Sequence, residues 1–239
     1  MPNWCYNSLK VTGEAGYSKD EKEMKKEQKE ISKEVKKFVK ENFKKNADGD
    51  LQLTFRAAVP MPKELEITSG STTSSAMELI QAKSGNYSGI DKMMDWQWTA
   101  KSCGYTKASS LEYKRKKIIK YLEGKLTLKE MQEGQQALDN IKKYGCKDWY
   151  DWSLENWGTK WDACEGGTHI SDYEVEASFD TAWAPPTPWL EKVSVKYKKL
   201  RFELEYTEEG MGFEGKAFAK AGDLVDNSMN IEYPDEFWD

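Results

Sequence analysis

The sequence predicts an α+β protein with a ferredoxin-like antiparallel sheet, helices on one face of that sheet, and a helical insertion. Two observations lead to this fold class. The order strand–helix–strand occurs twice along the chain, and each strand segment alternates apolar with polar residues. The stretch between the two repeats has helical periodicity instead. We therefore expect residues 1–62 and 144–239 to form one α+β domain, with residues 63–143 inserted as helices.

The first repeat begins with an alternating strand at Ser8–Gly13 and continues with a long charged helix at residues 19–45. The helix is indicated by apolar residues that recur with a period near 3.6 and by Glu and Lys residues spaced as i,i+4 pairs. Residues 51–57 alternate again before Pro60, which predicts a half-buried second strand. The apolar positions are Met24, Ile31, Val35, Phe38, Val39 and Phe43 in the helix, and Leu51, Leu53, Phe55 and Ala57 in the strand.

The insertion starts with a polar segment. Residues 68–75 are Ser, Thr and Gly, which offer nothing to bury and predict the most mobile internal loop. Residues 75–147 predict helices with two apolar stripes, one made of Leu111, Ile118, Ile119 and Leu122 and the other of Leu128, Met131, Leu138 and Ile141. Residues 101–147 hold twelve Lys or Arg against five Asp or Glu, and we interpret this charge as a solvated outer face rather than a nucleic-acid surface.

The second repeat has three clear parts. A strand is predicted at residues 173–181, and Pro186–Trp189 opens a helix with Thr187 as its cap and Pro188 in its first turn. A strand at residues 200–206 follows. The turn Gly210–Gly212 then leads into a fifth strand near Phe213–Ala219, and a sixth short strand is predicted near Met229–Tyr233.

Composition limits the class of protein. Apolar residues make up 38% and charged residues 32%, no run of about 18 apolar residues occurs, and the first residues resemble no secretory leader. We expect a globular protein without a membrane partner, located in the cytoplasm. The four cysteines, Cys5, Cys103, Cys146 and Cys164, form no CxxC pair, which disfavours a zinc site and favours ordinary reduced thiols.

The formal net charge is −5, and the acids are unevenly distributed. Residues 148–180 hold nine acids against one Lys, and residues 201–239 hold eleven acids against three bases. A nucleic-acid binder usually has a basic balance, so a nucleic-acid partner is disfavoured. The acidic tail favours either solubility or a basic partner.

Four of the ten tryptophans lie within residues 149–162. Such a density indicates either a packed aromatic seam or a ligand platform. In the structural interpretation Gly158 ends a helix with positive φ, and Trp157 and Trp161 pack back on the sheet. In the functional interpretation an aromatic side chain stacks on a base and a lysine meets a phosphate. In this interpretation Trp161 or Trp183 supplies the ring and Lys160 the ammonium. Because the first and third strands are neighbours in a ferredoxin-like sheet, Trp4 and Asn7 of the first strand line the same pocket, so the predicted ligand site comprises Trp4, Asn7, Lys160, Trp161 and Trp183.

Catalytic alternatives have weak support. His169, the single histidine, has no neighbouring nucleophile, and a metal site built with Asp162, Cys164 and Asp172 matches no standard spacing. The carboxylate pairs Glu174/Glu176 and Glu203/Glu205 are typical of solvated strand faces. The sequence contains no phosphate-binding loop and no nucleophile elbow. We expect no catalytic residue, no metal and no cofactor.

Several motifs resemble the YubB-like proteins of phages and plasmids, which carry a ferredoxin-like domain. The most specific is Asn-Trp-Gly-Thr-Lys-Trp-Asp at residues 156–162. The others are Met1–Asn7, Val59–Pro62, Tyr144-Gly145 with Asp148–Trp152, and Ala182–Pro186. The resemblance extends from residue 1 to about 215, is weak in the insertion, and departs from the family at Ala184, where Ser is more usual. It implies a fold and a mobile-element origin rather than a reaction.

These features favour a non-enzymatic binding protein of a phage or plasmid that acts in the host cytoplasm against host defence. In the first mechanism, the Trp-rich pocket sequesters a small nucleotide-like ligand. In the second, acidic surfaces bind and block a host defence protein. A nucleotide hydrolase or nuclease is the third alternative.

Overall fold

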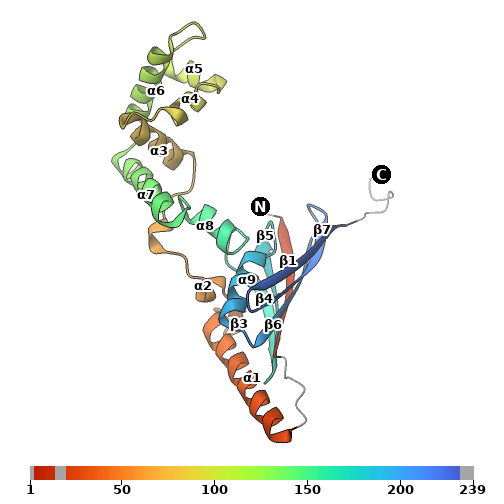
Figure 1. Ribbon diagram of the computed structural model, residues 1–239. Coiled ribbons are helices and arrows are strands. Elements are labelled where there is room, and N and C mark those ends of the chain that lie inside the picture. Colours follow the sequence, from red (N-terminus) through yellow and green to blue (C-terminus); the bar gives the residue numbers. More distant parts are fainter. Residues whose placement is uncertain (1–2, 14–19, 232–239) are drawn as a thin grey trace, which may run out of the picture. The chain divides into compact units, whose positions relative to one another are not determined.

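The computed structural model describes residues 3–13 and 20–231, and the chain divides into two compact units. The first unit, here called the sheet unit, comprises Met1–Met61 and Ser153–Asp239. The second, the helical unit, comprises Pro62–Trp152 and so contains the whole of residues 63–143. Figure 1 labels the elements of each unit. Helix α8 (Trp149–Asn156) carries the boundary between them.

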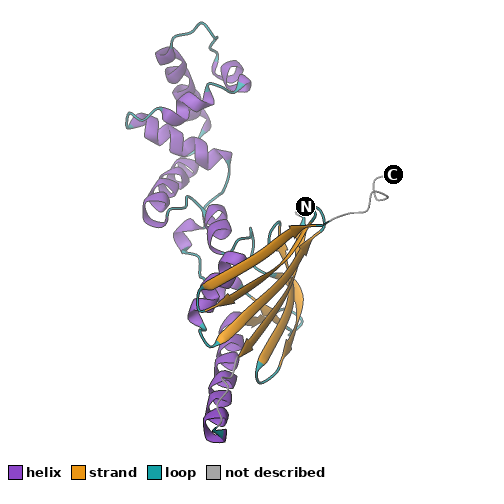
Figure 2. Cartoon of the chain, turned by 45° about the vertical axis from the view of Figure 1, so that its right-hand side comes forward, coloured by secondary structure: helices purple, strands orange, loops and turns teal. Residues whose placement is uncertain are grey.

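The sheet unit is built on six antiparallel strands in the order β4-β5-β1-β6-β7-β8. Figure 2 draws the strands as orange arrows. Strand β1 comes from the N-terminal part of the chain, yet it lies in the middle of the sheet, where Leu9 is opposite Ala177 on one side and Leu204 on the other. The strands are β1 (Trp4–Gly13), β4 (Cys164–Ile170), β5 (Glu174–Ala182), β6 (Leu200–Glu208), β7 (Phe213–Lys220) and β8 (Asp223–Asn230).

Two helices cover one face of this sheet (Figure 1). Helix α1 (Glu21–Asn42) packs on β1, β5 and β6, and α9 (Thr187–Lys196) packs on β6, β7 and β8. Alternation places every second strand residue against them, and Phe38 of α1 meets the rings of Tyr197 and Phe202 edge-on at 5.2 and 5.5 Å. We call the other side, which carries the exposed strand residues, the open face. The predicted α+β class, with helices on one sheet face, is confirmed.

Most strand and helix predictions of the sheet unit are confirmed, with shifted ends. The strands predicted at 8–13, 173–181, 200–206 and 213–219 correspond to β1, β5, β6 and β7. The last strand, β8, starts before the predicted range, and residues 232–233 of that range lie outside the described residues, as does residue 19 of the predicted first helix. That helix ends at Asn42 because Phe43 opens strand β2 (Phe43–Lys45). Thr187 is the first helical residue of α9 rather than its cap.

The strand predicted at residues 51–57 is confirmed only for Leu51–Leu53. Strand β3 (Leu51–Leu53) pairs only with β2 in a separate two-stranded sheet, and helix α2 (Phe55–Ala58) follows. The sheet edge beside β5 is occupied by β4, which the sequence did not predict. The cause is Asp162, whose carboxylate accepts hydrogen bonds from the Thr54 hydroxyl and the Phe55 amide and thereby turns the backbone into a helix.

The helical unit contains a short 3₁₀ turn, η1, and five helices, which confirms the helices predicted at residues 75–147. They are η1 (Lys63–Leu65), α3 (Ser71–Lys83), α4 (Ser88–Met93), α5 (Gln97–Cys103), α6 (Leu111–Lys125) and α7 (Leu128–Tyr144). The mobile loop predicted at residues 68–75 is wrong, because α3 starts within it. The Thr73 side chain is buried there, and its hydroxyl donates to the Thr68 carbonyl at 2.6 Å.

One predicted apolar stripe of this unit is only partly confirmed, because Met131 packs against the buried core and Leu138 is half-buried. Leu128 and Ile141 are exposed, and α7 instead buries Gly134 and Ala137 where it packs on α3. A Cβ on Gly134 would lie 2.5 Å from the Ala76 Cβ, so small residues set this contact. In the other stripe Ile118 and Leu122 are buried, while Leu111 is exposed. Among the described residues, the helices are too short or too polar to cross a membrane.

Candidate functional site

The segment Trp157–Asp162 divides into residues that hold the fold and residues that face outward. Trp157 is buried, its indole N–H donates to the Val59 carbonyl at 2.9 Å, and its ring contacts Phe55. The hydroxyl of Thr159 donates to the Ala182 carbonyl at 3.0 Å, and Asp162 caps α2. Thr159 thus attaches the segment to β5 of the sheet, whereas Trp157 and Asp162 attach it to residues 54–59 around α2. Trp157 is packed, but its contacts are with the α2 segment rather than with the sheet as expected.

Gly158 satisfies the prediction of a helix end with positive φ. Its φ is +85°, which an L side chain adopts only with strain. A Cβ there would also lie 2.4 Å from the Pro188 Cδ. Backbone conformation and close packing therefore both require glycine at this point.

Lys160 and Trp161 occupy the outward side of the same segment. The Trp161 ring lies 6.1 Å from the ring of Trp4, and the Lys160 Nζ lies 4.6 Å from the Trp161 ring centroid. Trp161 remains 37% exposed, so it does not pack back fully on the sheet. The segment thus presents a cation and two aromatic rings together, an arrangement suited to cation–π and stacking contacts.

Trp183 stands at the end of β5 in an unusual backbone conformation. Its φ is +75°, which is rare for a residue with a large side chain, and its side chain is 46% exposed. Its amide donates to the Asn3 carbonyl at 3.0 Å, directly before Trp4 in the chain. Such strain persists only where the surroundings hold it, and it is concentrated at functional sites.

Asn7 supports this turn from the helix-covered side of the sheet. Its side-chain amide donates to the carbonyls of Cys5 and Phe179 at 2.8 and 3.2 Å and to the Thr181 hydroxyl at 2.9 Å. Thr181 in turn donates to the Ala184 carbonyl at 2.8 Å. Asn7 therefore acts as a positioning residue for the Trp183 turn, with its donors already engaged.

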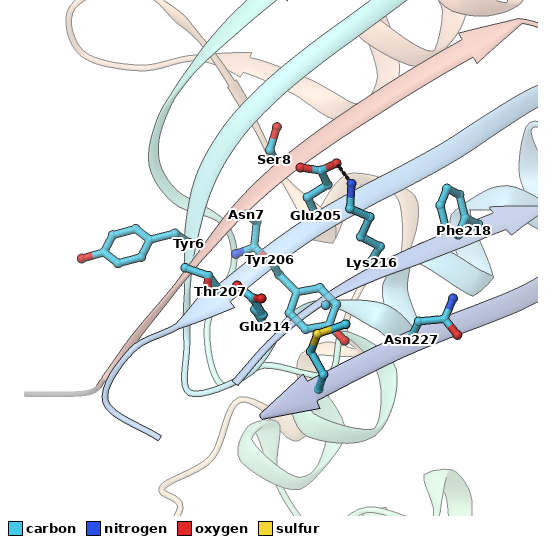
Figure 3. Close-up of a pocket in the computed structure, with 12 residues that line it drawn as sticks. Tyr6, Asn7, Ser8, Glu205, Tyr206, Thr207, Glu214, Lys216, Phe218 and Asn227 are labelled. Atoms are coloured by element: carbon cyan, nitrogen blue, oxygen red, sulfur yellow. Dashed lines mark hydrogen bonds and ion pairs between the residues drawn. The ribbon is translucent and has the colours of Figure 1, made fainter. Parts of the chain in front are cut away.

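A hollow of about 540 Å³ lies on the open face and is drawn in Figure 3; its wall comes from β1, β6, β7 and β8 and includes none of these tryptophans. Tyr6 contributes to its wall, is 51% exposed, and points to the same side of β1 as Trp4, two residues away. The other outward residues of the wall are Ser8, Glu205, Thr207, Glu214, Lys216, Phe218, Asn227 and Met229, with Asn7, Tyr206 and Gly215 between them in the strands.

Charge in the hollow is mainly negative. The Lys216 ammonium pairs closely with Glu205 (Figure 3), which leaves the Glu214 carboxylate to set the sign of the potential. Asp180 is opposite Tyr6 in the sheet, and burial together with nearby Glu165 raises the pKa of its carboxyl. A phosphate is repelled here, whereas hydroxyl groups find acceptors.

Other candidate groups lie elsewhere. His169 is an exposed residue of β4, opposite Glu176. Among the described residues, no cluster of three or more His, Cys, Asp or Glu side chains is arranged to hold a metal ion. Burial raises the pKa of the Cys5 thiol to about 12, so this thiol stays protonated near neutral pH.

The structure thus brings together Trp4, Lys160, Trp161 and the backbone of Trp183, and places the Asn7 side chain on the opposite sheet face. The sequence patterns did not predict the hollow. Alternation in β1 identifies Tyr6 as an outward neighbour of Trp4. The other walls come from β6, β7 and β8, and only their pairing shows that these residues meet.

Comparison with known protein families gives a match over part of the chain. Residues 156–236 match the family model described as the ferredoxin-like domain in Api92-like protein. This segment supplies β4 to β8 and α9, so the expected ferredoxin-like domain is confirmed for the C-terminal part of the chain. Comparison with curated proteins found no match.

A solved structure, protein Api92 from Yersinia pseudotuberculosis, is similar to this chain at 12% sequence identity with a TM-score of 0.37. The alignment covers 98% of this chain and 99% of that chain.

Proposed function

We propose that the chain is a non-enzymatic binding protein of a phage or plasmid that sequesters a small nucleotide-like ligand in the host cytoplasm as a counter-defence. The observation that carries the proposal is the meeting of Trp4, Trp161 and the Lys160 ammonium on the sheet unit, where Trp4 lies two residues along β1 from Tyr6 of the hollow. The resemblance to YubB-like proteins supports the mobile-element origin.

Different residues of this surface suit the base, the phosphate and the sugar of a nucleotide. The exposed indoles of Trp161 and Trp183 offer faces on which a base stacks. The Lys160 ammonium beside them attracts a phosphate. The carboxylates of Asp180 and Glu214 accept hydrogen bonds from sugar hydroxyls, because they repel phosphate but not a neutral donor.

Isothermal titration of the full chain with mono-, cyclic mono- and cyclic dinucleotides tests the proposal. Binding of one class is expected, and chromatography should show the nucleotide unchanged. Trp161→Ala should weaken binding by about 1–3 kcal/mol through lost stacking. Lys160→Ala should weaken binding and lower the slope of log K against log salt by about 1.

Lys45→Ala is the matched control, since Lys45 is an exposed lysine of the same unit at the end of β2. It should bind as the unchanged chain does. If none of the nucleotides binds, or if Trp161→Ala leaves the affinity unchanged, ligand sequestration is contradicted. If chromatography shows that the nucleotide has been converted to a product, the protein is not a purely binding protein, and a hydrolase is favoured.

A second candidate is favoured by a different feature of the open face. Met229 and Val225 are more than half exposed on β8, and Glu203 and Glu205 lie on β6 of the same face. An apolar patch next to carboxylates suits a basic surface of a host defence protein. If this is the function, Glu203→Lys should abolish salt-sensitive binding of that protein, and the titrations should detect no nucleotide binding.

A further inference from the structure

A second charged surface lies in the helical unit, within α5, α6 and the loop that joins them. Residues 97–125 contain eight Lys or Arg and only two Glu. One of the bases, Arg115, is neutralised by a bidentate pair with Asp91 at 2.8 and 2.6 Å. The remaining lysines determine what this surface attracts.

Three of these lysines surround a hollow of about 640 Å³ between α5 and α6. Lys117, Lys120 and Lys125 have no carboxylate partner within 4.0 Å in the part of the chain that the structure describes, unlike Lys83 and Lys143 of the same unit. The rest of the wall is Ser102, Cys103, Tyr121 and Gly124. Three ammonium groups around one concavity favour a phosphate group as occupant.

Tyrosine rings hold two of these lysines in place. The Lys117 Nζ lies 5.4 Å from the Tyr113 ring centroid, and the Lys125 Nζ lies 5.6 Å from that of Tyr121. Tyr113, Lys117, Lys120 and Tyr121 also share one side of α6, because residues spaced by three or four project the same way. Lys117 and Lys120 therefore present their charges on the same side of α6.

An exposed aromatic pair accompanies the lysines. The rings of Trp96 and Trp98 stack at 5.8 Å with 28° between their planes, and the side chains are 50% and 48% exposed. Trp98 lies four residues before Ser102 on the same side of α5, so it is about 6 Å from the hollow along the helix axis. Two tryptophans kept in water beside unpaired lysines require an explanation beyond packing.

We infer that this surface of α5 and α6 binds single-stranded nucleic acid, with backbone phosphates at the lysine hollow and bases stacked on the Trp96–Trp98 pair. Stacking requires an unpaired base, which favours a single strand over a duplex. A lipid surface is flat on this scale and contacts protruding groups, whereas these lysines line a concavity. The inference is independent of the nucleotide site proposed on the sheet unit.

Fluorescence anisotropy of a labelled 20-nucleotide oligo(dT), titrated with the full chain from 0.05 to 0.3 M salt, tests the inference. Binding should weaken linearly with log salt. Replacing all three lysines, as Lys117→Ala with Lys120→Ala and Lys125→Ala, should lower the slope by about 2 and the affinity by about 50-fold at 0.15 M salt, from a slope of about 0.7 per phosphate contact.

Trp98→Ala should lower the affinity by about 5- to 150-fold with an unchanged slope, and Trp98→Phe should restore most of the loss. The matched control replaces three ion-paired lysines of the same unit, as Lys83→Ala with Lys129→Ala and Lys142→Ala, and should keep the slope of the unchanged chain. Circular dichroism confirms folding, since all these side chains are partly or fully exposed.

The inference is overturned if the chain does not bind oligo(dT) at 0.05 M salt. It is also overturned if both triple variants lose the same amount of affinity for oligo(dT). If Trp98→Ala leaves the affinity for oligo(dT) unchanged, the proposed stacking of bases on the Trp96–Trp98 pair is overturned. If the chain instead sediments with phosphatidylserine vesicles, and the first triple variant alone prevents this, the surface belongs to a membrane.

Discussion

The sheet unit and the helical unit use similar residues in opposite ways. In the sheet unit, Trp157 and Trp189 are buried beneath the sheet and hold together segments far apart in the sequence. In the helical unit, Trp96 and Trp98 stack on each other in water. The charges differ too, because carboxylates dominate the hollow of the sheet unit and lysines surround that of the helical unit. The same residue type thus acts as core in one unit and as exposed surface in the other.

The two units also differ in the sequence distance of their contacts. Strand β1 of the sheet unit is paired with β5 and β6, which lie more than 150 residues later in the chain. The helical unit is one continuous stretch, Pro62–Trp152. A substitution in the first unit therefore tests long-range packing, whereas one in the second tests contacts between neighbouring helices.

The largest effect is expected for Trp157→Ala. Trp157 is 2% exposed and contacts Phe55, so its removal leaves a cavity and should lower the free energy of unfolding by about 3–5 kcal/mol. Trp161→Ala, in the same segment, should lower it by only about 1–2 kcal/mol because the ring is already partly in water. Urea denaturation measures both. Equal losses would contradict the division of this segment into packing and outward residues.

A pair of glycines tests the helical unit. Gly124→Ala adds a Cβ in open space on α6 and should raise stability by up to about 1 kcal/mol, because alanine favours the helix. Gly134→Ala gains the same propensity but places its Cβ 2.5 Å from that of Ala76, and should lower stability by about 1–3 kcal/mol. Thermal unfolding distinguishes the signs, and stabilisation by both variants would show that α3 and α7 do not pack closely.

The turn at Trp183 offers a test of stored backbone strain. Trp183→Gly and Trp183→Ala both remove the indole, but glycine adopts a φ of +75° without the Cβ penalty. The glycine variant should therefore be more stable than the alanine variant by about 1–2 kcal/mol. Equal denaturation midpoints would argue against strain at this position. Neither variant should retain the stacking contribution to ligand binding.

The smallest effects concern pH, and their signs should be opposite in the two units. The Arg115 guanidinium lowers the pKa of Asp91 in the helical unit, so this pair stabilises above the unfolded pKa and the contribution is lost as pH falls through the folded pKa. Burial raises the pKa of Asp180 in the sheet unit, so its charged form destabilises at neutral pH and the penalty disappears as pH falls.

Asp91→Asn should accordingly lower stability at pH 7, and Asp180→Asn should raise it, each by about 1 kcal/mol or less because both groups remain partly exposed. Both differences should shrink toward pH 3. Denaturation midpoints measured from pH 3 to 7 check this. A shift of the same sign for both variants would contradict the assigned environments.

The limits of sequence reading appear at particular residues. Leu51, Leu53 and Phe55 alternate as strand residues do, but Phe55 is buried in a helix because Asp162, more than 100 residues later, caps it. The Ser and Thr residues near 71–75 resemble a loop, yet α3 buries Thr73 among other helices. In α7 the contact face is made of Gly134 and Ala137, which a search for large apolar residues passes over. In each case a distant partner outweighed the local pattern.

The sequence by itself determined the α+β class, the strands β1, β5, β6 and β7, the helix α1 and the glycine turn at Gly158. These features depend on alternation, helical periodicity and backbone conformation, which are local properties. Only the tertiary structure decided that β4 takes the sheet edge, that Asn7 supports a turn rather than facing a ligand, and that Tyr6 joins Met229 around one hollow. These outcomes depend on which strands pair and which side chains meet across the fold, and residues distant in the chain set those contacts.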